Sequence, residues 1–248
     1  MKSGGVIRMS GTTLKFMMAI LMVLDHIGYF VPPEVGGIFH VLTRCVGVFF
    51  CYMAVEGFHY TRNRKSYLLR LTGMAIFMEI GNRVINWLIQ NPAIVVHNNI
   101  FLTLATGIAM LYLISLVSKQ SSGLKKSFLI LASILVLALG IIFTEGGMVE
   151  LPFMLITYLC RNKPKVRNVL YLVMSVVLFS MSFVSYPTLY ETLDMLAYNS
   201  DFMFITVLPF IYLYNGKRGM NNLFSKYFFY FFYPIHLWLI ALLSANLL

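Results

Sequence analysis

The chain has 248 residues, of which 59% are apolar and only 11% are charged. Soluble domains are nearer to about a quarter charged and about half apolar, so this composition excludes an ordinary soluble enzyme and predicts a polytopic membrane protein. A formal net charge of +10 would indicate a nucleic-acid partner in a soluble protein. The positions of the basic residues, given below, exclude that interpretation here.

Hydropathy divides the chain into about nine apolar segments. In chain order they lie near residues 11–31, 36–59, 67–90, 98–117, 127–143, 147–160, 168–186, 201–214 and 222–246. The connections between them are short and leave no room for a sizeable soluble domain. The sequence therefore predicts an all-α polytopic integral membrane protein with about nine transmembrane helices, organised as one domain over residues 1–248.

The connections between the apolar segments alternate in charge. All but two of the basic residues lie at the start of the chain or in every second connection: Lys2, Arg8, Lys15; Arg62, Arg64, Lys65, Arg70; Lys119, Lys125, Lys126; Arg161, Lys163, Lys165, Arg167; Lys217, Arg218, Lys226. The connections between these hold acidic residues instead: Glu34, Glu145, Glu150, Glu191 and Asp194. The positive-inside rule then predicts a cytoplasmic amino terminus and a carboxyl terminus outside. The charge excess reports topology, and we expect no nucleic-acid partner.

Several ionisable side chains fall inside the predicted spans. A charge at the bilayer centre costs about 2.5 to 3.5 kcal/mol on insertion scales, so such residues face a partner or a polar cavity. Asp25 and His26 are adjacent on the first span, Arg44 lies on the second and His236 lies near the middle of the last. A histidine near a carboxylate has the properties of a general base. These four residues are the predicted catalytic group, with Arg44 stabilising either Asp25 or an oxyanion.

A second set of polar residues is assigned to the cavity or to the acceptor. Glu79 and Arg83 are four residues apart on one helix, so they can neutralise each other. Both this structural role and a functional role remain open for the pair. Asn99 and Thr103 share a helical face, which is typical both of helix packing and of a pocket wall. The full predicted set is Glu56, Glu79, Asn99, Thr103, Glu145, Tyr230 and Tyr233. The three cysteines have no metal-ligand spacing, and no metal is expected.

Five ordered motifs resemble those of the TraX family, the membrane acetylases named for acetylation of a conjugative pilin's amino terminus. They are LKFMMAILMVLDHIG at 14–28, the stretch from Arg44 to Glu56-Gly57-Phe58, HYTRNRKSYLLRL at 59–71, NIFLTL at 99–104 and FYFFYPIHL at 229–237. The chain departs from the family pattern at Thr43-Arg44 and Val48, where Gly-Arg and Pro are usual. It departs again at Glu145-Gly146-Gly147, where Asp-Tyr-Gly is usual, so the acceptor does not transfer from the pilin case.

The resemblance implies an integral membrane N- or O-acetyltransferase, one transmembrane acyltransferase domain in a bacterial inner membrane. Its acyl donor is cytosolic acetyl-CoA, and its acceptor is a peptide or protein amino terminus or a glycan hydroxyl. The donor's phosphates are expected near Arg62, Arg64, Lys65 and Arg70, with Tyr60 beside them, because arginine matches phosphate geometry. His26 or His236 would deprotonate the acceptor, by direct transfer or through an acetyl-histidine intermediate.

Two other classes of function use the same residues. A proton-coupled transporter would use Asp25, His26, Glu56 and His236 as a relay, although the chain lacks two similar halves with broken hydrophobic segments. A non-catalytic membrane assembly partner would use the intramembrane charges only as packing contacts.

Overall fold

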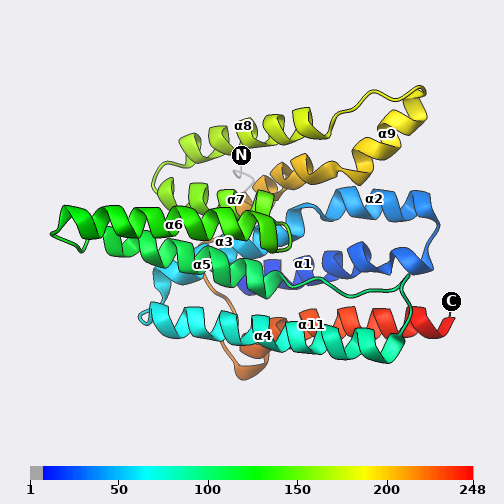
Figure 1. Ribbon diagram of the computed structural model, residues 1–248, viewed down its shortest axis with the longest axis horizontal. Coiled ribbons are helices and arrows are strands. Elements are labelled where there is room, and N and C mark those ends of the chain that lie inside the picture. The colour runs from blue at the N-terminus through cyan, green and yellow to red at the C-terminus, as the bar shows by residue number, and fades with distance from the viewer. Residues whose placement is uncertain (1–7, 248) are drawn as a thin grey trace, which may run out of the picture. The chain divides into compact units, whose positions relative to one another are not determined.

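The structure is a computed structural model that describes residues 8–247, so Lys2 of the first basic group lies outside the described residues. Helices make up nearly all of this part of the chain, which holds no strand beyond one isolated bridge between Met9 and Tyr214. In chain order the elements (Figure 1) are α1 Gly11–His26, η1 Ile27–Phe30, α2 Pro33–Thr43, α3 Cys45–Tyr60, α4 Arg64–Ile89, α5 Ile100–Val117, α6 Gly123–Phe143, α7 Gly147–Leu159, α8 Pro164–Ser182, α9 Leu189–Tyr198, η2 Ser200–Val207, α10 Leu208–Leu213 and α11 Leu223–Leu247.

Within residues 8–247, six helical stretches are long and apolar enough to cross a membrane. They are Gly11–Phe30, Pro33–Tyr60, Ile100–Val117, Gly123–Phe143, Pro164–Ser182 and Leu223–Leu247. A seventh is possible if Leu189–Tyr198 and Ser200–Leu213, bent by 56° at their junction, form one broken span. The all-α polytopic class is thus confirmed, whereas the count of nine and the orientation of the termini stay predictions.

The chain divides into two compact units. Unit 1 combines Met1–Phe49 with Leu172–Leu248, and unit 2 is the intervening segment Phe50–Tyr171. Because the boundaries fall inside α3 and α8, each of these helices contributes to both units.

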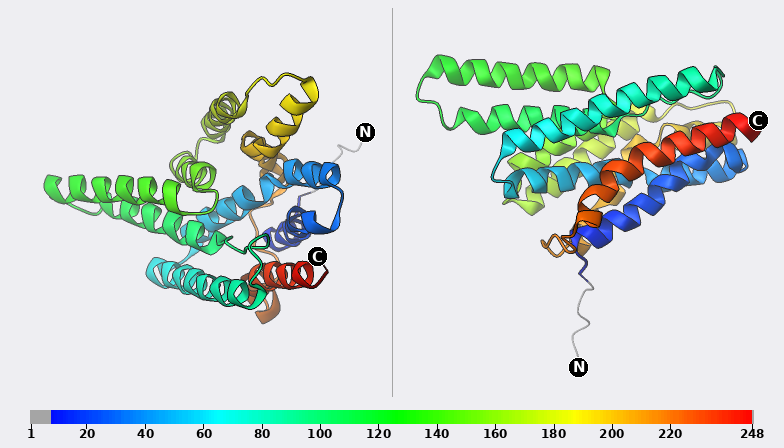
Figure 2. Two further views of the ribbon diagram at one scale, coloured as in Figure 1. Left: turned by 45° about the vertical axis from the view of Figure 1, so that its right-hand side comes forward. Right: turned by 90° about the horizontal axis from the view of Figure 1, so that it is seen from below.

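Unit 1 brings the two ends of the chain together. Helices α1 and α11 lie side by side and run in the same direction (Figure 2), and α1 also packs against α2. Leu14 and Met18 of α1 and Phe204 and Val207 of η2 are almost completely buried. The Ser10 hydroxyl accepts from the Thr13 amide and so caps the amino-terminal end of α1.

Unit 2 is built from α4 to α7 and the adjoining parts of α3 and α8. Helices α5 and α6 form an antiparallel hairpin (Figure 1). Small residues let these helices approach closely, as in many membrane bundles. A Cβ added to Gly107 of α5 would meet the Met154 sulfur at 2.3 Å, and one added to Gly140 of α6 would meet Leu151 Cδ1 at 2.4 Å. Both contacts are made to α7, which is therefore held against the hairpin.

The span predicted at 36–59 lies within the candidate span Pro33–Tyr60, which has a break at Arg44 between α2 and α3. One element differs from the sequence-based expectation. The connection predicted at 187–200 contains a helix, α9, that begins with a capping box between Thr188 and Glu191. Hydropathy did not find α9 because Glu191 and Asp194 interrupt its apolar residues.

We expect Gly147→Ala to destabilise unit 2. A Cβ at this position would lie 2.3 Å from the Gly140 carbonyl oxygen, a backbone atom that cannot rotate away, so the α6–α7 turn must shift. The free energy of unfolding should fall by about 1 to 3 kcal/mol, read as a lower thermal midpoint in detergent micelles. The matched control is Gly73→Ala in α4, where a Cβ meets nothing within 4 Å, and it should be neutral or slightly stabilising. Equal destabilisation by both variants would contradict the prediction.

Candidate active site

Asp25 of α1 is held by side chains from α2 and from the residue that follows it. The Thr43 hydroxyl donates to Asp25 Oδ1 at 2.6 Å, and Arg44 Nη2 lies 3.1 and 3.0 Å from Oδ1 and Oδ2. The side chains of Asp25 and Arg44 are each only 22% exposed. The Asp25 carboxylate and the Arg44 guanidinium therefore neutralise each other inside the first two candidate spans. The sequence predicted such a pairing, because a charged side chain within a membrane span needs a partner.

His40 and Asp201 complete this ionic cluster. His40 Nδ1 lies 3.5 Å from Asp25 Oδ1, and its Nε2 lies 3.1 Å from the Tyr198 carbonyl oxygen of α9. Arg44 Nε donates to the His40 carbonyl oxygen at 3.0 Å, and Arg44 Nη1 lies 3.5 Å from Asp201 Oδ1. The guanidinium is thus fixed from several sides and is aimed at Asp25. This position favours its role as the partner of Asp25 over that of an oxyanion ligand.

The two predicted catalytic histidines meet between α1 and α11. The rings of His26 and His236 are 5.2 Å apart, edge to face, at 77°. His26 Nδ1 lies 2.7 Å from the Met22 carbonyl oxygen, and His236 Nδ1 lies 2.9 Å from the Phe232 carbonyl oxygen. Because a carbonyl oxygen can only accept, each Nδ1 carries the hydrogen. In the neutral ring each Nε2 then carries a lone pair and can accept a proton.

His236 Nε2 is buried and has no hydrogen-bond partner among the described residues. An unsatisfied buried nitrogen is unfavourable in a folded protein and is a feature of sites that bind or react with something else. Phe232 stacks on the His236 ring at 5.0 Å and Tyr233 packs against it edge to face at 5.7 Å. Tyr233 is therefore beside the histidine pair, and the cavity role of Tyr233 and Tyr230 stays a prediction. Aromatic packing holds the ring of His236 in one orientation.

Three of the polar residues predicted to line the cavity or bind the acceptor, Asn99, Thr103 and Glu145, come together at the start of α5. Glu145, in the α6–α7 turn, accepts from the Asn98 side-chain amide and from the Asn99 backbone N–H. The Thr103 hydroxyl donates to the Glu145 carbonyl oxygen at 2.6 Å. A carboxylate at a helix amino terminus is favourable because it meets free N–H groups and the positive end of the helix dipole. The arrangement stabilises this corner of unit 2, and a contact with an acceptor here stays a prediction.

The remaining predicted cavity residues, Glu56 and Glu79, are both paired. Arg83 Nε donates to Glu79 Oε1 at 2.9 Å within α4, and both side chains are exposed, so the neutralising pair forms. Glu56 Oε1 lies 3.5 Å from Arg161 Nε. Neither carboxylate lies in the ionic cluster of unit 1.

The predicted donor-binding residues lie around the α3–α4 connection of unit 2. Tyr60, Arg62, Lys65 and Arg70 are exposed, and the Arg64 guanidinium lies 4.4 Å from the centre of the Phe58 ring. Arg161, the partner of Glu56, lies 5.4 Å from the centre of the Tyr60 ring. The structure therefore brings these residues together as a basic surface.

Sequence reasoning missed three members of the ionic cluster: His40, Thr43 and Asp201. His40 precedes Arg44 by four residues, so helical spacing alone placed the two on one face. Thr43 directly precedes Arg44 and was noted only as a departure from a family motif. Asp201 had no such signal, because 157 residues separate it from Arg44. Only the folded chain brings it near.

Comparison with known proteins gives two matches. The family profile described as TraX protein matches residues 10–244. The chain is also 26% identical over 248 residues to the "Probable fimbrial assembly protein FimC, serogroup H1" of Dichelobacter nodosus, with 94% of each chain covered. No solved structure matches.

We expect Arg44→Gln to destabilise unit 1, because it leaves the Asp25 carboxylate without its cation. Removing one partner of a largely buried pair exposes the desolvation penalty of the other, and we expect a loss of about 2 kcal/mol for this pair. The measurement is the thermal unfolding midpoint in detergent micelles. Arg83→Gln is the control, because its exposed pair with Glu79 should contribute less than about 0.5 kcal/mol. An unchanged midpoint for Arg44→Gln would contradict the central role of the pair.

Proposed function

Since the chain belongs to the TraX family, we propose that it is a membrane acetyltransferase that moves an acetyl group from acetyl-CoA to an amine or hydroxyl acceptor. One observation carries the proposal. Two histidines face each other with each Nδ1 on a backbone carbonyl and each Nε2 in the form that accepts a proton. Burying two imidazole rings between membrane helices costs free energy that an apolar packing contact would avoid. The same pair has the properties that general base catalysis needs.

The transfer uses one histidine as base and then as acid. Nε2 of His26 or His236 takes the proton of a neutral amine or hydroxyl as the acceptor's nitrogen or oxygen bonds to the acetyl carbonyl carbon. The carbon–sulfur bond then breaks, and the protonated histidine returns the proton to the leaving sulfur, so that coenzyme A departs as its thiol. An amino terminus, with an unperturbed pKa of about 7.7 to 8.0, needs little help to reach its neutral form. A sugar hydroxyl depends far more on the base.

The ionic cluster supports this step from the neighbouring position on α1. Asp25 directly precedes His26 on α1, and its carboxylate stabilises the positive charge that appears when this ring is protonated. Arg44 and Thr43 hold that carboxylate at 3.0 and 2.6 Å. They keep it in one position without bonding to His26. Asp25 is thus an electrostatic partner of the base, and the Met22 carbonyl sets the tautomer.

The predicted topology divides the two substrates between the faces of a bacterial inner membrane. Acetyl-CoA is a cytosolic compound, and the basic surface formed by Arg62, Arg64, Lys65 and Arg70 lies on the side that the positive-inside rule assigns to the cytoplasm. Its guanidinium groups suit phosphates. The acceptor approaches from the other side. The relative's name as a fimbrial assembly protein favours the amino terminus of a surface-fibre subunit as acceptor.

We expect His26→Ala and His236→Ala to fold and to lose acetyl transfer. Loss of a general base lowers the rate by about 10²- to 10⁴-fold. The measurement is mass spectrometry of peptide and glycan acceptors incubated with isotope-labelled acetyl-CoA and purified protein. His97→Ala is the matched control, because His97 is exposed in the α4–α5 connection and should leave transfer unchanged.

Two outcomes would overturn the proposal. Near-normal transfer by both single variants and by the double variant would exclude the histidine pair as the base. A folded wild-type protein that binds no acetyl-CoA, transfers no label to any acceptor, and carries protons in proteoliposomes would favour the transporter. If the two variants lower only the yield of folded protein, the pair is a packing contact.

A further inference from the structure

Two connections of unit 2 meet at the end of α3. His59 stacks on Tyr158 of α7, with ring centres 5.1 Å apart and the ring planes at 12°. Phe58 packs edge to face against the same Tyr158 ring at 6.0 Å. Arg161, in the α7–α8 connection, lies 5.4 Å from the centre of the Tyr60 ring. The α7–α8 connection therefore lies against the residues that lead into the α3–α4 connection.

The contact continues along one face of α3. Tyr52, Glu56 and His59 are four and three residues apart, so they lie on the same helical face. Glu56 Oε1 lies 3.5 Å from Arg161 Nε, and the Arg167 guanidinium of α8 lies 5.9 Å from the centre of the Tyr52 ring. Arg161 is thus near the end of α3, and Arg167 is about one helical turn farther along it.

The arginines in this region outnumber the carboxylates beside them. Glu56 pairs with Arg161, whereas Arg64 and Arg167 form no ion pair with any described residue. Arg167 is only 7% exposed, and its Nε and Nη2 donate to the neutral Asn168 side chain at 3.3 and 3.2 Å. A buried cation without an anion is unfavourable. This end of unit 2 is therefore suited to an added negative charge.

The first turns of two helices are basic as well. Helix α4 begins with Arg64 and Lys65, and α8 has Lys165 and Arg167 near its start. Neither first turn contains an acidic residue. The amino-terminal end of a helix is the positive end of its dipole and favours negative groups. Basic side chains at this end are unfavourable by themselves, and a bound anion would compensate for them.

Aromatic rings hold the two more accessible arginines. The Arg64 guanidinium lies 4.4 Å from the centre of the Phe58 ring, and Arg161 lies against Tyr60. A contact with the face of a ring does not use the N–H groups of a guanidinium, so both arginines can still donate to a ligand. His59, between these two rings in the chain, has a buried Nε2 without a hydrogen-bond partner in the described part of the protein. The polar groups at this end of α3 are thus not all satisfied by the protein itself.

We propose that the phosphate groups of coenzyme A bind between the two connections, with Arg64 donating from the start of α4 and Arg161 from the α7–α8 connection. This rests on the proposed function and deepens it, because it adds a second connection to the basic surface after α3. Glu56 holds Arg161 through Nε, which leaves its two Nη groups for the ligand, and Arg167 adds positive charge nearby. The fork of a guanidinium matches the oxygens of a phosphate.

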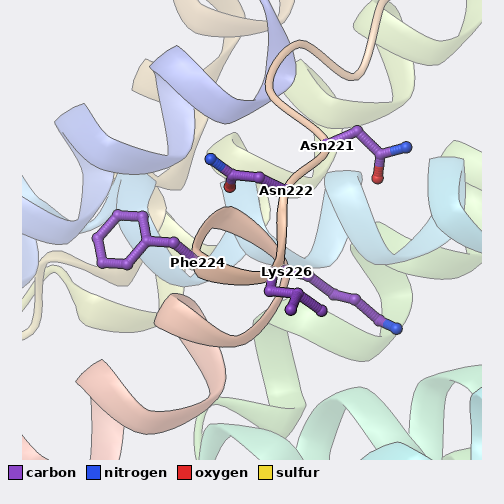
Figure 3. A pocket seen from close by; sticks show the side chains of 5 residues that line it. Asn221, Asn222, Phe224 and Lys226 are labelled. Carbon is purple, nitrogen blue, oxygen red and sulfur yellow. The ribbon is translucent and has the colours of Figure 1, made fainter.

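The surface hollow at the beginning of α11, in unit 1, is a weaker candidate for the same phosphates. Its volume is about 660 Å³, and it is lined by Asn221, Asn222, Leu223, Phe224 and Lys226. Figure 3 shows Lys226 pointing away from Phe224 and Asn222. A single exposed lysine offers a point charge and no fork. Lys226 is therefore a suitable control residue.

The first test separates phosphate binding from the rest of the donor. S-acetylpantetheine carries the same thioester and arm without the nucleotide and its phosphates. We expect Arg64→Gln and Arg161→Gln each to raise KM for acetyl-CoA about tenfold and to leave KM for S-acetylpantetheine unchanged. A merely structural role would affect both donors alike. Lys226→Met is the control and should change neither value.

A double variant separates phosphate binding by Arg161 from its ion pair with Glu56. If Arg161 serves only to neutralise Glu56, removing both charges in a Glu56→Gln, Arg161→Gln variant should restore the wild-type KM for acetyl-CoA. We expect KM to stay raised, because the phosphate still lacks one of its ligands. A wild-type KM in the double variant would overturn the assignment of Arg161.

A further measurement needs no turnover. In nanodiscs of neutral lipid, coenzyme A should raise the thermal midpoint of the wild type, and Arg161→Gln should reduce that shift. If Arg161→Gln does not fold, Arg64→Gln replaces it. The proposal fails if the variant responds to coenzyme A as the wild type does and differs only in its response to phosphatidylglycerol. That result would identify a lipid headgroup as the anion.

The phosphate site and the acetyltransferase fail in distinguishable ways. Normal KM values for Arg64→Gln and Arg161→Gln, together with an inactive His26→Ala, would exclude the phosphate site and leave the acetyltransferase standing. A wild type that coenzyme A stabilises through the two arginines, but that transfers no acetyl group to any acceptor, would do the reverse. Absence of any coenzyme A effect on the wild type would remove both.

Discussion

The carboxylate of Asp25 and the guanidinium of Arg44 depend on each other, and the candidate active site depends on the pair. Inside candidate membrane spans neither charge has bulk water to solvate it, so each is tolerable only because the other is 3.0 Å away. Thr43, His40 and Asp201 satisfy further donors and acceptors of the two groups. The residue that ends α2 is thereby fixed against the last turn of α1. That turn carries His26, so the ionic cluster also fixes the backbone from which the His26 ring projects.

The histidine pair follows from a different principle. In each ring, Nδ1 donates a hydrogen bond to the backbone carbonyl oxygen four residues earlier in the same helix. That bond selects the tautomer without a carboxylate, and it leaves the second nitrogen of each ring for chemistry. Under the proposed function, the charge of the neighbouring Asp25 stabilises the protonated His26 ring. The group that orients the base is then separate from the group that stabilises its charged form.

Several features of the site could be predicted from the sequence because they depend only on residues that are close together in the chain. Asp25, His26, Arg44 and His236 interrupt apolar segments, and a charged or imidazole side chain in such a segment needs a partner wherever the fold places it. The Glu79–Arg83 pair could be predicted in the same way, because residues four apart on a helix are neighbours. His40 was within reach of the same argument but was hidden in a segment read as one continuous span. Asp201 and Tyr198 were not, since their contacts with Arg44 and His40 join parts of the chain more than 150 residues apart in sequence.

The sequence by itself determined the class of the protein, the positions of its apolar segments and the identity of the ionisable residues among them, because hydropathy and helical periodicity are properties of neighbouring residues. The tertiary structure decided which of those residues meet. It paired Asp25 with Arg44, set His26 against His236, and tied Glu145 to the start of α5. Such pairings depend on helix packing between distant segments, which the order of residues along one helix does not contain.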